Sequence, residues 1–351
     1  MCQLEQRCGA GLTSAQQTSG ADQVAGADRV AGADQVAGAI ERARAGDARA
    51  LARLLSLVED GAPALRTVMA ALAPLTGRAR IIGLTGAPGV GKSTVTAALV
   101  AAYRARDLRV GVLAVDPTSP FSGGALLGDR VRMQDHATDP GVFIRSMATR
   151  GHLGGLSRAA PQALRVLDAA GFDVLLLETV GVGQAEVEVA SLADTTLVLV
   201  APGMGDAIQA AKAGILEVAD VFVVNKADKP GAQEAVRDLR TMIAMAQRGA
   251  GEWKPPIVTT VAVRGEGIDE LAGAVDAHWS WLDSSGQLEA RRHARARAEI
   301  TAIAVAELRQ RVGGLPGDSR LGALADRVAA GDLDPFAAAD ELVATAAAAS
   351  G

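Results

Sequence analysis

The segment GAPGVGKST at residues 86–94 follows a short apolar run, RIIGLT. The pattern G-x-x-x-x-G-K-[ST] between a strand and a helix is typical of a loop that binds phosphate, because its glycines let backbone N–H groups point inward. We expect Lys92 to reach the β- and γ-phosphates of a nucleotide, Ser93 to bind Mg²⁺ and Thr94 to bond the α-phosphate region. The predicted nucleotide-binding residues here are Gly86, Ala87, Pro88, Gly89, Val90, Gly91, Lys92, Ser93 and Thr94.

The tetrapeptide Asn225-Lys226-Ala227-Asp228 follows a second apolar run, VFVVN, and predicts which base is bound. A carboxylate can accept from both N1–H and N2–H₂ of guanine, whereas adenine presents an acceptor at N1 and no amino group at C2. The mismatch with adenine costs about 1.5–3 kcal/mol, the strength of one charged hydrogen bond. We expect Asp228 to read guanine, Asn225 to brace the loops and Lys226 to lie along the base. Ala262, after the run IVTTV, is predicted to donate its N–H to the guanine oxygen.

Acidic residues at two strand ends are candidate Mg²⁺ ligands. Asp116 follows the run RVGVLAV, and Glu178 ends the run DVLLLE. Mg²⁺ takes oxygen ligands in near-octahedral geometry, usually one or two carboxylates together with phosphate and water. A third acid, Asp129, lies in a predicted loop, and spacing alone fits a surface charge as well as a metal contact.

Gly181 lies three residues after Glu178, where the D-x-x-G pattern of GTPases places a glycine whose amide senses the γ-phosphate. No glutamine directly follows Gly181, so the usual water-positioning residue is missing from its usual place. We therefore expect slow intrinsic GTP hydrolysis that a partner stimulates. The predicted catalytic residues are Lys92, Glu178 and Gly181.

Short runs rich in Val, Ile and Leu must position these motifs. They occupy residues 80–85, 109–115, 173–178, 196–201, 221–225 and 257–261. Because helical stretches separate them, they predict an α/β fold with a mainly parallel sheet covered on both faces. Ligands of such sheets bind at the carboxyl ends of the strands, which is where the motifs occur.

Four regions are expected along the chain. They are a low-complexity, disordered leader (1–39) with a hexapeptide repeated three times, an N-terminal helical extension (40–78), a nucleotide-binding domain (79–283) and a C-terminal helical arm (284–351). Ser284 or Ser285 is predicted to cap a long helix that runs to Gln310. This helix carries Arg291, Arg292, Arg295 and Arg297, a basic stripe that fits either a solvated face or a contact with a partner or second subunit.

Composition excludes several classes of protein. The 351 residues carry a net charge of −5 and only 3% aromatic residues, which argues against nucleic-acid binding. The two cysteines, Cys2 and Cys8, exclude a disulfide framework and a four-cysteine zinc site. No apolar run is long enough for a membrane span and no secretory signal is recognisable, so we expect a cytoplasmic protein.

Several segments together resemble the MeaB/ArgK family of G proteins over about residues 40–345. They are GAPGVGKST, VDPTSPFSGGALLGDRVRM, RGHLGG, ETVGVGQAE, PGMGDAIQAAKAGILEVAD and NKAD. The resemblance implies a GTPase with the three-layer sandwich of P-loop NTPases, helical N- and C-terminal extensions and a homodimer formed by the C-terminal arm. It also implies a chaperone of adenosylcobalamin-dependent methylmalonyl-CoA mutase that gates cofactor loading and protects the mutase from inactivation.

By the same resemblance, GTP or GDP is bound with Mg²⁺, and the metal ligands are Ser93, Asp116, Asp129 and Glu178. ETVGVGQ becomes a loop that reports the nucleotide state, and residues 203–212 become a second such loop at the mutase interface. Whether the partner is methylmalonyl- or isobutyryl-CoA mutase stays open, as does any role of the leader.

Two other functions are considered. A GTPase that delivers nickel would need Cys/His clusters, for which Cys2 and Cys8 are a poor substitute. An ATP-dependent kinase linked to lysine/arginine/ornithine transport would prefer ATP, against which Asp228 argues.

Overall fold

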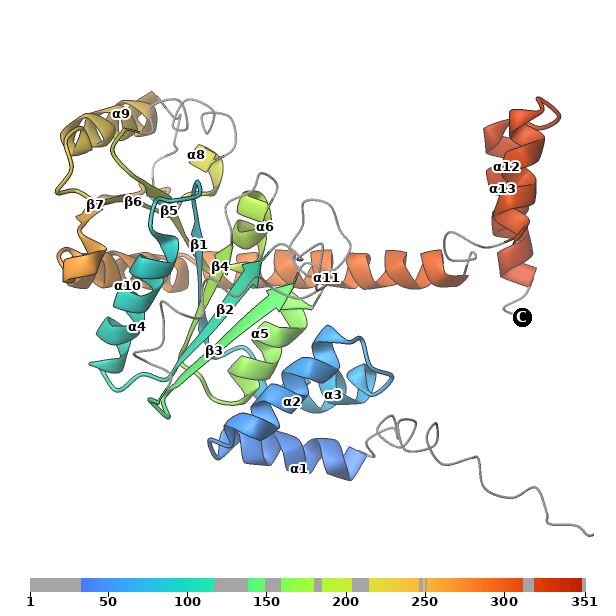
Figure 1. Cartoon of the computed structure of the whole chain (residues 1–351), viewed down its shortest axis with the longest axis horizontal. Helices are drawn as coiled ribbons and strands as arrows, with labels where there is room; N and C mark the ends of the chain where they lie inside the picture. The colour runs from blue at the N-terminus through green and yellow to red at the C-terminus, as the bar shows by residue number, and fades with distance from the viewer. Residues whose placement is uncertain are drawn as a thin grey trace, which may run out of the picture.

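The computed structural model describes residues 33–116, 138–148, 159–179, 185–203, 215–245, 249, 251–311 and 319–348. The strands in this part of the chain form one sheet in the order β3-β2-β4-β1-β5-β6-β7, and every neighbouring pair is parallel (Figure 1). Their bounds are Arg80–Thr85 (β1), Val110–Asp116 (β2), Val142–Ala148 (β3), Val174–Thr179 (β4), Thr195–Val200 (β5), Val221–Asn225 (β6) and Ile257–Thr260 (β7).

Each of the six predicted apolar runs matches a strand to within one residue, and the expected parallel α/β sheet is confirmed. The edge strand β3 was not predicted. Its sequence, VFIRSMA, interrupts the apolar pattern with Arg145 and Ser146. Arg145 pairs with Glu59 and contacts Ser56 of the N-terminal extension, which stabilises a charged residue at this position in the strand.

Helices cover both faces of the sheet. On one face, α4 (Lys92–Arg104) and α10 (Ile268–Ser284) bury residues such as Leu99 and Val275 against the strands. The opposite face carries α5 (Ala160–Ala169), α6 (Ala185–Leu192) and α9 (Ala232–Met245). Short helices at Ala73–Leu75 (η1), Ile215–Val218 (α8) and Ala262–Arg264 (η4) complete this region.

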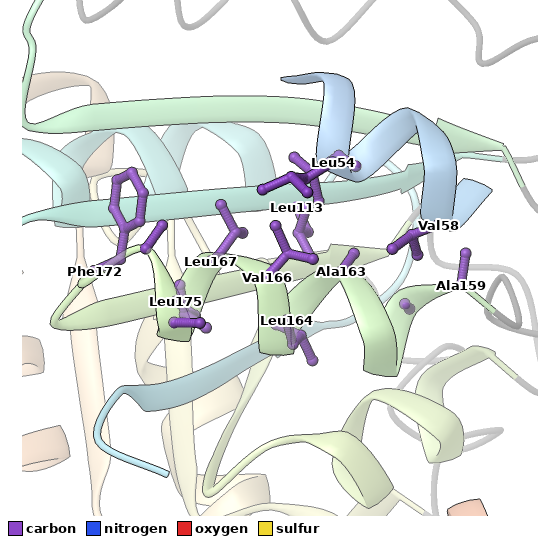
Figure 2. Packing of buried hydrophobic residues seen from close by; sticks show 14 of the residues in the cluster. Leu54, Val58, Leu113, Ala159, Ala163, Leu164, Val166, Leu167, Phe172 and Leu175 are labelled. Atoms are coloured by element: carbon purple, nitrogen blue, oxygen red, sulfur yellow. The ribbon is translucent and has the colours of Figure 1, made fainter. Parts of the chain in front are cut away.

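The N-terminal extension packs on the α5 side of the sheet. It consists of α1 (Ala33–Arg44), α2 (Ala48–Glu59) and α3 (Leu65–Leu72). Leu54 and Val58 of α2 belong to one buried cluster with Leu113 of β2 and Leu167 of α5 (Figure 2). The extension therefore shares the hydrophobic core of the sheet.

The beginning of α1 differs from the prediction, because the helix starts at Ala33, inside the expected leader of residues 1–39. Val36, Ile40 and Ala43 are all buried, and their spacing of four and three residues forms an apolar stripe. The third copy of the hexapeptide thus supplies the valine that anchors α1. Residues 1–32 lie outside the described part of the chain.

The C-terminal arm begins with α11 (Gln287–Arg311), a long helix that extends away from the sheet (Figure 1). The predicted capping role of Ser284 or Ser285 is wrong. Ser284 is the last residue of α10, and the Ser285 hydroxyl donates to the carbonyl of Trp281 at 2.6 Å. Two further helices, α12 (Ser319–Ala329) and α13 (Pro335–Ala348), are joined by an Arg327–Glu341 ion pair.

Asp194, which precedes β5, anchors the root of α11 to the sheet. This fully buried carboxylate accepts the backbone N–H of Ile81 at 3.0 Å. Arg292 and Arg295 reach it from α11 at 3.3 and 3.1 Å, and Arg295 also donates to the carbonyl of Leu192. Arg292 and Arg295 therefore bind the nucleotide-binding domain of the same chain. This differs from both expected alternatives, a solvated face and a contact with a partner or second subunit.

Asp220, which precedes β6, binds a third arginine. Arg291 donates to both of its carboxylate oxygens at 2.9 and 2.8 Å, and His278 Nε2 lies 3.2 Å from Oδ1. Burial raises the pKa of Asp220. The hydrogen bonds and positive charges of His278 and Arg291 lower it by more than burial raises it, so the net pKa lies below its ordinary value. The fourth predicted basic residue, Arg297, is exposed.

None of the helices in the described ranges combines the length and apolar character that crossing a membrane requires.

Candidate nucleotide-binding site

The phosphate loop joins the end of β1 to the start of α4. Gly86 and Gly91 both have positive φ, at 141° and 96°. A Cβ on Gly86 would overlap the carbonyl oxygen of Leu199, and one on Gly91 would overlap the side-chain amide of Asn225. Both positions therefore require glycine. The loop leads into the first turn of α4, and the N-terminus of a helix favours an anion through its first N–H groups and its dipole.

Lys92 is the first residue of α4, and its side chain is buried within the loop. Its ammonium donates to the carbonyl oxygens of Gly86 at 2.8 Å and Ala87 at 3.3 Å. The positive charge is thereby held inside the turn that the motif assigns to phosphate. Thr94, two residues further along α4, is half-buried.

Ser93 and Glu178, two predicted Mg²⁺ ligands, lie together. Glu178 is buried near the end of β4, where it pairs in register with Leu84 of β1. The Ser93 hydroxyl donates to Glu178 Oε1 at 2.6 Å. Hydroxyl and carboxylate oxygens are the hard donors that Mg²⁺ prefers, so this pair fits the ion.

Thr96 also contacts Glu178, although no sequence motif assigns it to the site. Its hydroxyl lies 2.9 Å from Glu178 Oε2 and 3.0 Å from the carbonyl oxygen of Lys92. A signal was present, because Thr96 is a polar residue on a helix face that otherwise carries Val95, Leu99 and Val100.

Of the other predicted metal and catalytic residues, only the backbone of Asp116 is described. The backbone of Asp116 ends β2 beside the end of β4, at the same edge of the sheet as Glu178. Asp129 and Gly181 lie outside the described residues, as do residues 204–212 of the second predicted loop.

Asn225 connects the phosphate loop with the loop after β7. Its side-chain amide donates to the carbonyl of Val90 at 2.9 Å. Its Oδ1 accepts the hydroxyl of Thr260 at 3.1 Å and the backbone N–H of Ala262 at 3.3 Å. The amide of Ala262, which the sequence assigned to the guanine oxygen, thus donates to Asn225 in this structure.

Lys226 and Asp228 form a turn directly after β6. Lys226 has a φ of 57°, and its ammonium donates to the carbonyl oxygen of Gly89 at 2.7 Å. The turn is closed by the N–H of Lys229, which bonds the Lys226 carbonyl at 2.9 Å. The Asp228 side chain remains 28% exposed, so its carboxylate can meet a ligand. The predicted phosphate and base segments therefore adjoin at one edge of the sheet.

Comparison with known proteins gives consistent matches. A family model described as methylmalonyl Co-A mutase-associated GTPase MeaB matches residues 51–316, a range that includes the phosphate loop and the NKAD segment. A putative GTPase of Pyrococcus abyssi is 47% identical over 306 residues, covering 87% of this chain and 94% of that protein. The GTPase ArgK of Escherichia coli is 40% identical over 257 residues, covering 71% and 78%.

A solved structure is also similar. The crystal structure of a LAO/AO transport system kinase superimposes with a TM-score of 0.66 at 29% identity, covering 88% of this chain and 96% of that one. The likeness therefore extends over most of both chains.

Proposed function

The chain belongs to the MeaB family of GTPases, and we propose that it hydrolyses GTP as a chaperone of an adenosylcobalamin-dependent acyl-CoA mutase, with methylmalonyl-CoA mutase as the first candidate. The family match carries this proposal, because its description names a mutase-associated GTPase and its range includes both nucleotide motifs. In this role the protein gates cofactor loading and protects the mutase from inactivation. We place this role in the cytoplasm.

In the reaction, water attacks the γ-phosphorus of GTP, the bond to the β-phosphate oxygen breaks, and GDP and phosphate leave. We assign Lys92 and the first N–H groups of α4 to the charge on the β- and γ-phosphates. The buried position of the Lys92 ammonium inside the loop supports this role. Gly181 is proposed to sense the γ-phosphate through its amide, and Glu178 to act with the metal.

Mg²⁺ would be held by Ser93 and Glu178, with Asp116 and Asp129 as further ligands. The 2.6 Å contact between the Ser93 hydroxyl and Glu178 supports the first two assignments. When bound, the ion neutralises charge on the phosphate oxygens. The hydroxyl of Ser93 can keep donating to Glu178 while its lone pairs face the ion.

Guanine is proposed to bind between the NKAD turn and the loop after β7. Asp228 would accept from N1–H and N2–H₂, and the Lys226 stem, whose ammonium is held at Gly89, would lie along the base. Asn225 would keep the two loops together through its bonds to Val90 and Ala262.

We also propose a homodimer formed by the C-terminal arm. Large apolar side chains are exposed on α11 and α13, namely Ile300, Ile303, Leu308 and Phe336. Such residues are typical of a surface that another chain covers. Light scattering tests the proposal: a dimer mass is expected for the wild type and a monomer mass for Ile300→Glu, whereas a monomeric wild type would contradict it.

Co-purification with candidate mutases tests the chaperone role. We expect a complex with methylmalonyl-CoA mutase whose stability differs between GDP and a non-hydrolysable GTP analogue, with isobutyryl-CoA mutase as the comparison. In Asp228→Ala, which weakens guanine recognition, the difference between the two nucleotides should disappear. If no mutase binds in either nucleotide state, the chaperone proposal is wrong.

The alternative of an ATP-dependent kinase linked to lysine/arginine/ornithine transport takes support from the similar solved structure, which is called a LAO/AO transport system kinase. It predicts tight ATP binding and transfer of phosphate to a partner. The metallochaperone alternative would depend on Cys2 and Cys8, which lie outside the described residues; within the described ranges there is no group of three or more His, Cys, Asp or Glu residues able to hold a metal.

A further inference from the structure

Thr96 lies at the contact between α4 and β4. Val174 and Leu176 of β4 face α4 in the buried cluster, and the alternation of side chains along the strand places Glu178 on the same face. Thr96 is completely buried and lies one helical turn after Lys92. The carboxylate of Glu178, at the end of this apolar strand face, therefore contacts the hydroxyl of Thr96 on the side of α4 that packs against the sheet.

The Thr96 hydroxyl has one proton and two acceptors within reach. The carbonyl oxygen of Lys92 is 3.0 Å away, and Glu178 Oε2 is 2.9 Å away. Hydrogen bonds to an ionised carboxylate are stronger than those to a carbonyl, so the proton is directed to Glu178. Because Ser93 donates to Oε1 of the same group, hydroxyls of one helix hold both carboxylate oxygens.

We propose that Thr96 is a positioning residue for Glu178, fixing its rotamer so that Oε1 stays beside Ser93 and the pair is ready for a divalent cation. The inference rests on the proposed function, in which Ser93 and Glu178 bind Mg²⁺. Neighbouring groups that orient a ligand typically change metal affinity or activity 10- to 100-fold when they are lost. Thr96 thus sets the Mg²⁺ affinity of the site without touching the nucleotide.

Thr96→Val removes the hydroxyl and keeps the shape of the side chain, whereas Thr96→Ser keeps the hydroxyl. The readout is the Mg²⁺ concentration that half-maximally slows release of a fluorescent GDP analogue. We expect this concentration to rise about tenfold in Thr96→Val and to return to the wild-type value in Thr96→Ser. GDP affinity measured in EDTA should be the same in all three proteins.

A matched control separates positioning from the loss of a helix contact. Thr241 of α9 makes the same bond to the carbonyl four residues earlier, Arg237, at 3.0 Å, but is exposed and distant in sequence from the site. Thr241→Val should leave the Mg²⁺ dependence unchanged. Thr96→Ala repeats the test with a smaller side chain should Thr96→Val not fold.

A double-mutant cycle with Glu178→Gln completes the test. If Thr96 acts through Glu178, adding Thr96→Val to Glu178→Gln should not change the Mg²⁺ dependence further. Wild-type Mg²⁺ dependence in Thr96→Val, or additive effects in the cycle, would overturn the positioning role and leave the GTPase function intact. A wild type whose GDP release ignores Mg²⁺ would instead contradict the proposed metal site.

Discussion

Glu178 and Asp194 are both buried carboxylates, but they lie at opposite ends of the parallel strands. Glu178 is near the carboxyl end of β4 and contacts the hydroxyls of Ser93 and Thr96. Asp194 precedes β5 and contacts the guanidinium groups of two arginines in α11. The sheet thus carries similar acids with different kinds of partner at the two ends of its strands.

The chemistry of the partners explains the difference. A hydroxyl donates one hydrogen bond and still has lone pairs for a cation, whereas a guanidinium donates only. The Ser93–Glu178 pair can therefore take part in binding Mg²⁺, while the guanidinium contacts of Asp194 fix α11 to the sheet. The side of the sheet where the strands end, here called the carboxyl edge, is thus suited to nucleotide chemistry. The side where the strands begin, here called the amino edge, holds helix α11 of the C-terminal arm.

Asp194→Ala should have the largest effect on stability. It leaves two guanidinium groups and the N–H of Ile81 without their buried partner, and we expect the free energy of unfolding to fall by about 3–5 kcal/mol. Urea unfolding measures the loss, and Arg297→Ala on the exposed side of the same helix is the control. A loss below about 1 kcal/mol would contradict the anchoring role.

Lys92→Ala should have the largest effect on activity. Without the ammonium held in the phosphate loop, we expect kcat/KM for GTP to fall about 10²–10³-fold. The thermal unfolding temperature should change far less than in Asp194→Ala. The two carbonyl oxygens that the Lys92 ammonium bonds belong to the phosphate loop that directly precedes it, whereas Asp194 connects α11 with the sheet. Lys254→Ala, which removes an exposed lysine just before β7, should keep wild-type hydrolysis, and equal losses in both variants would contradict the role of Lys92.

Asp220→Asn tests the amino edge through pH. Since the folded pKa of Asp220 lies below its unfolded value, its contribution to stability is present above about pH 4 and is lost as pH falls through the folded pKa. We expect Asp220→Asn to lose about 1.5–3 kcal/mol at pH 7 and this difference to shrink below about pH 4. Urea unfolding across pH measures it, and a difference independent of pH would refute the assignment.

Arg66→Ala should have the smallest effect. Arg66 of α3 pairs with Glu307 of α11, but both side chains are exposed to solvent. Exposed ion pairs contribute about 0–1 kcal/mol, so the free energy of unfolding should hardly change. A loss above about 2 kcal/mol would show that α11 is held along its length and not mainly at its root.

Sequence predicted the carboxyl edge better than the amino edge for a physical reason. The apolar runs and the phosphate loop are local patterns, and six strands and the fold followed from them. At the amino ends of the strands, Arg291 binds Asp220 across 71 residues; at the carboxyl ends, the contact of Thr96 with Glu178 spans 82 residues and was not predicted either. Local periodicity does not reveal such pairs. Strand β3 was missed for the same reason. Arg145 interrupts its apolar pattern, and Glu59, which pairs with Arg145, lies 86 residues away in the sequence.

Titration of GTP and ATP against the wild type and Asp228→Ala tests the central claim most directly. We expect the wild type to bind GTP much more tightly than ATP. Asp228→Ala should lower GTP affinity about ten- to a hundredfold, because a charged hydrogen-bond partner of guanine is lost, and should leave ATP affinity unchanged. If ATP binds as tightly as GTP and the substitution changes neither affinity, the assignment of a guanine-nucleotide site is contradicted.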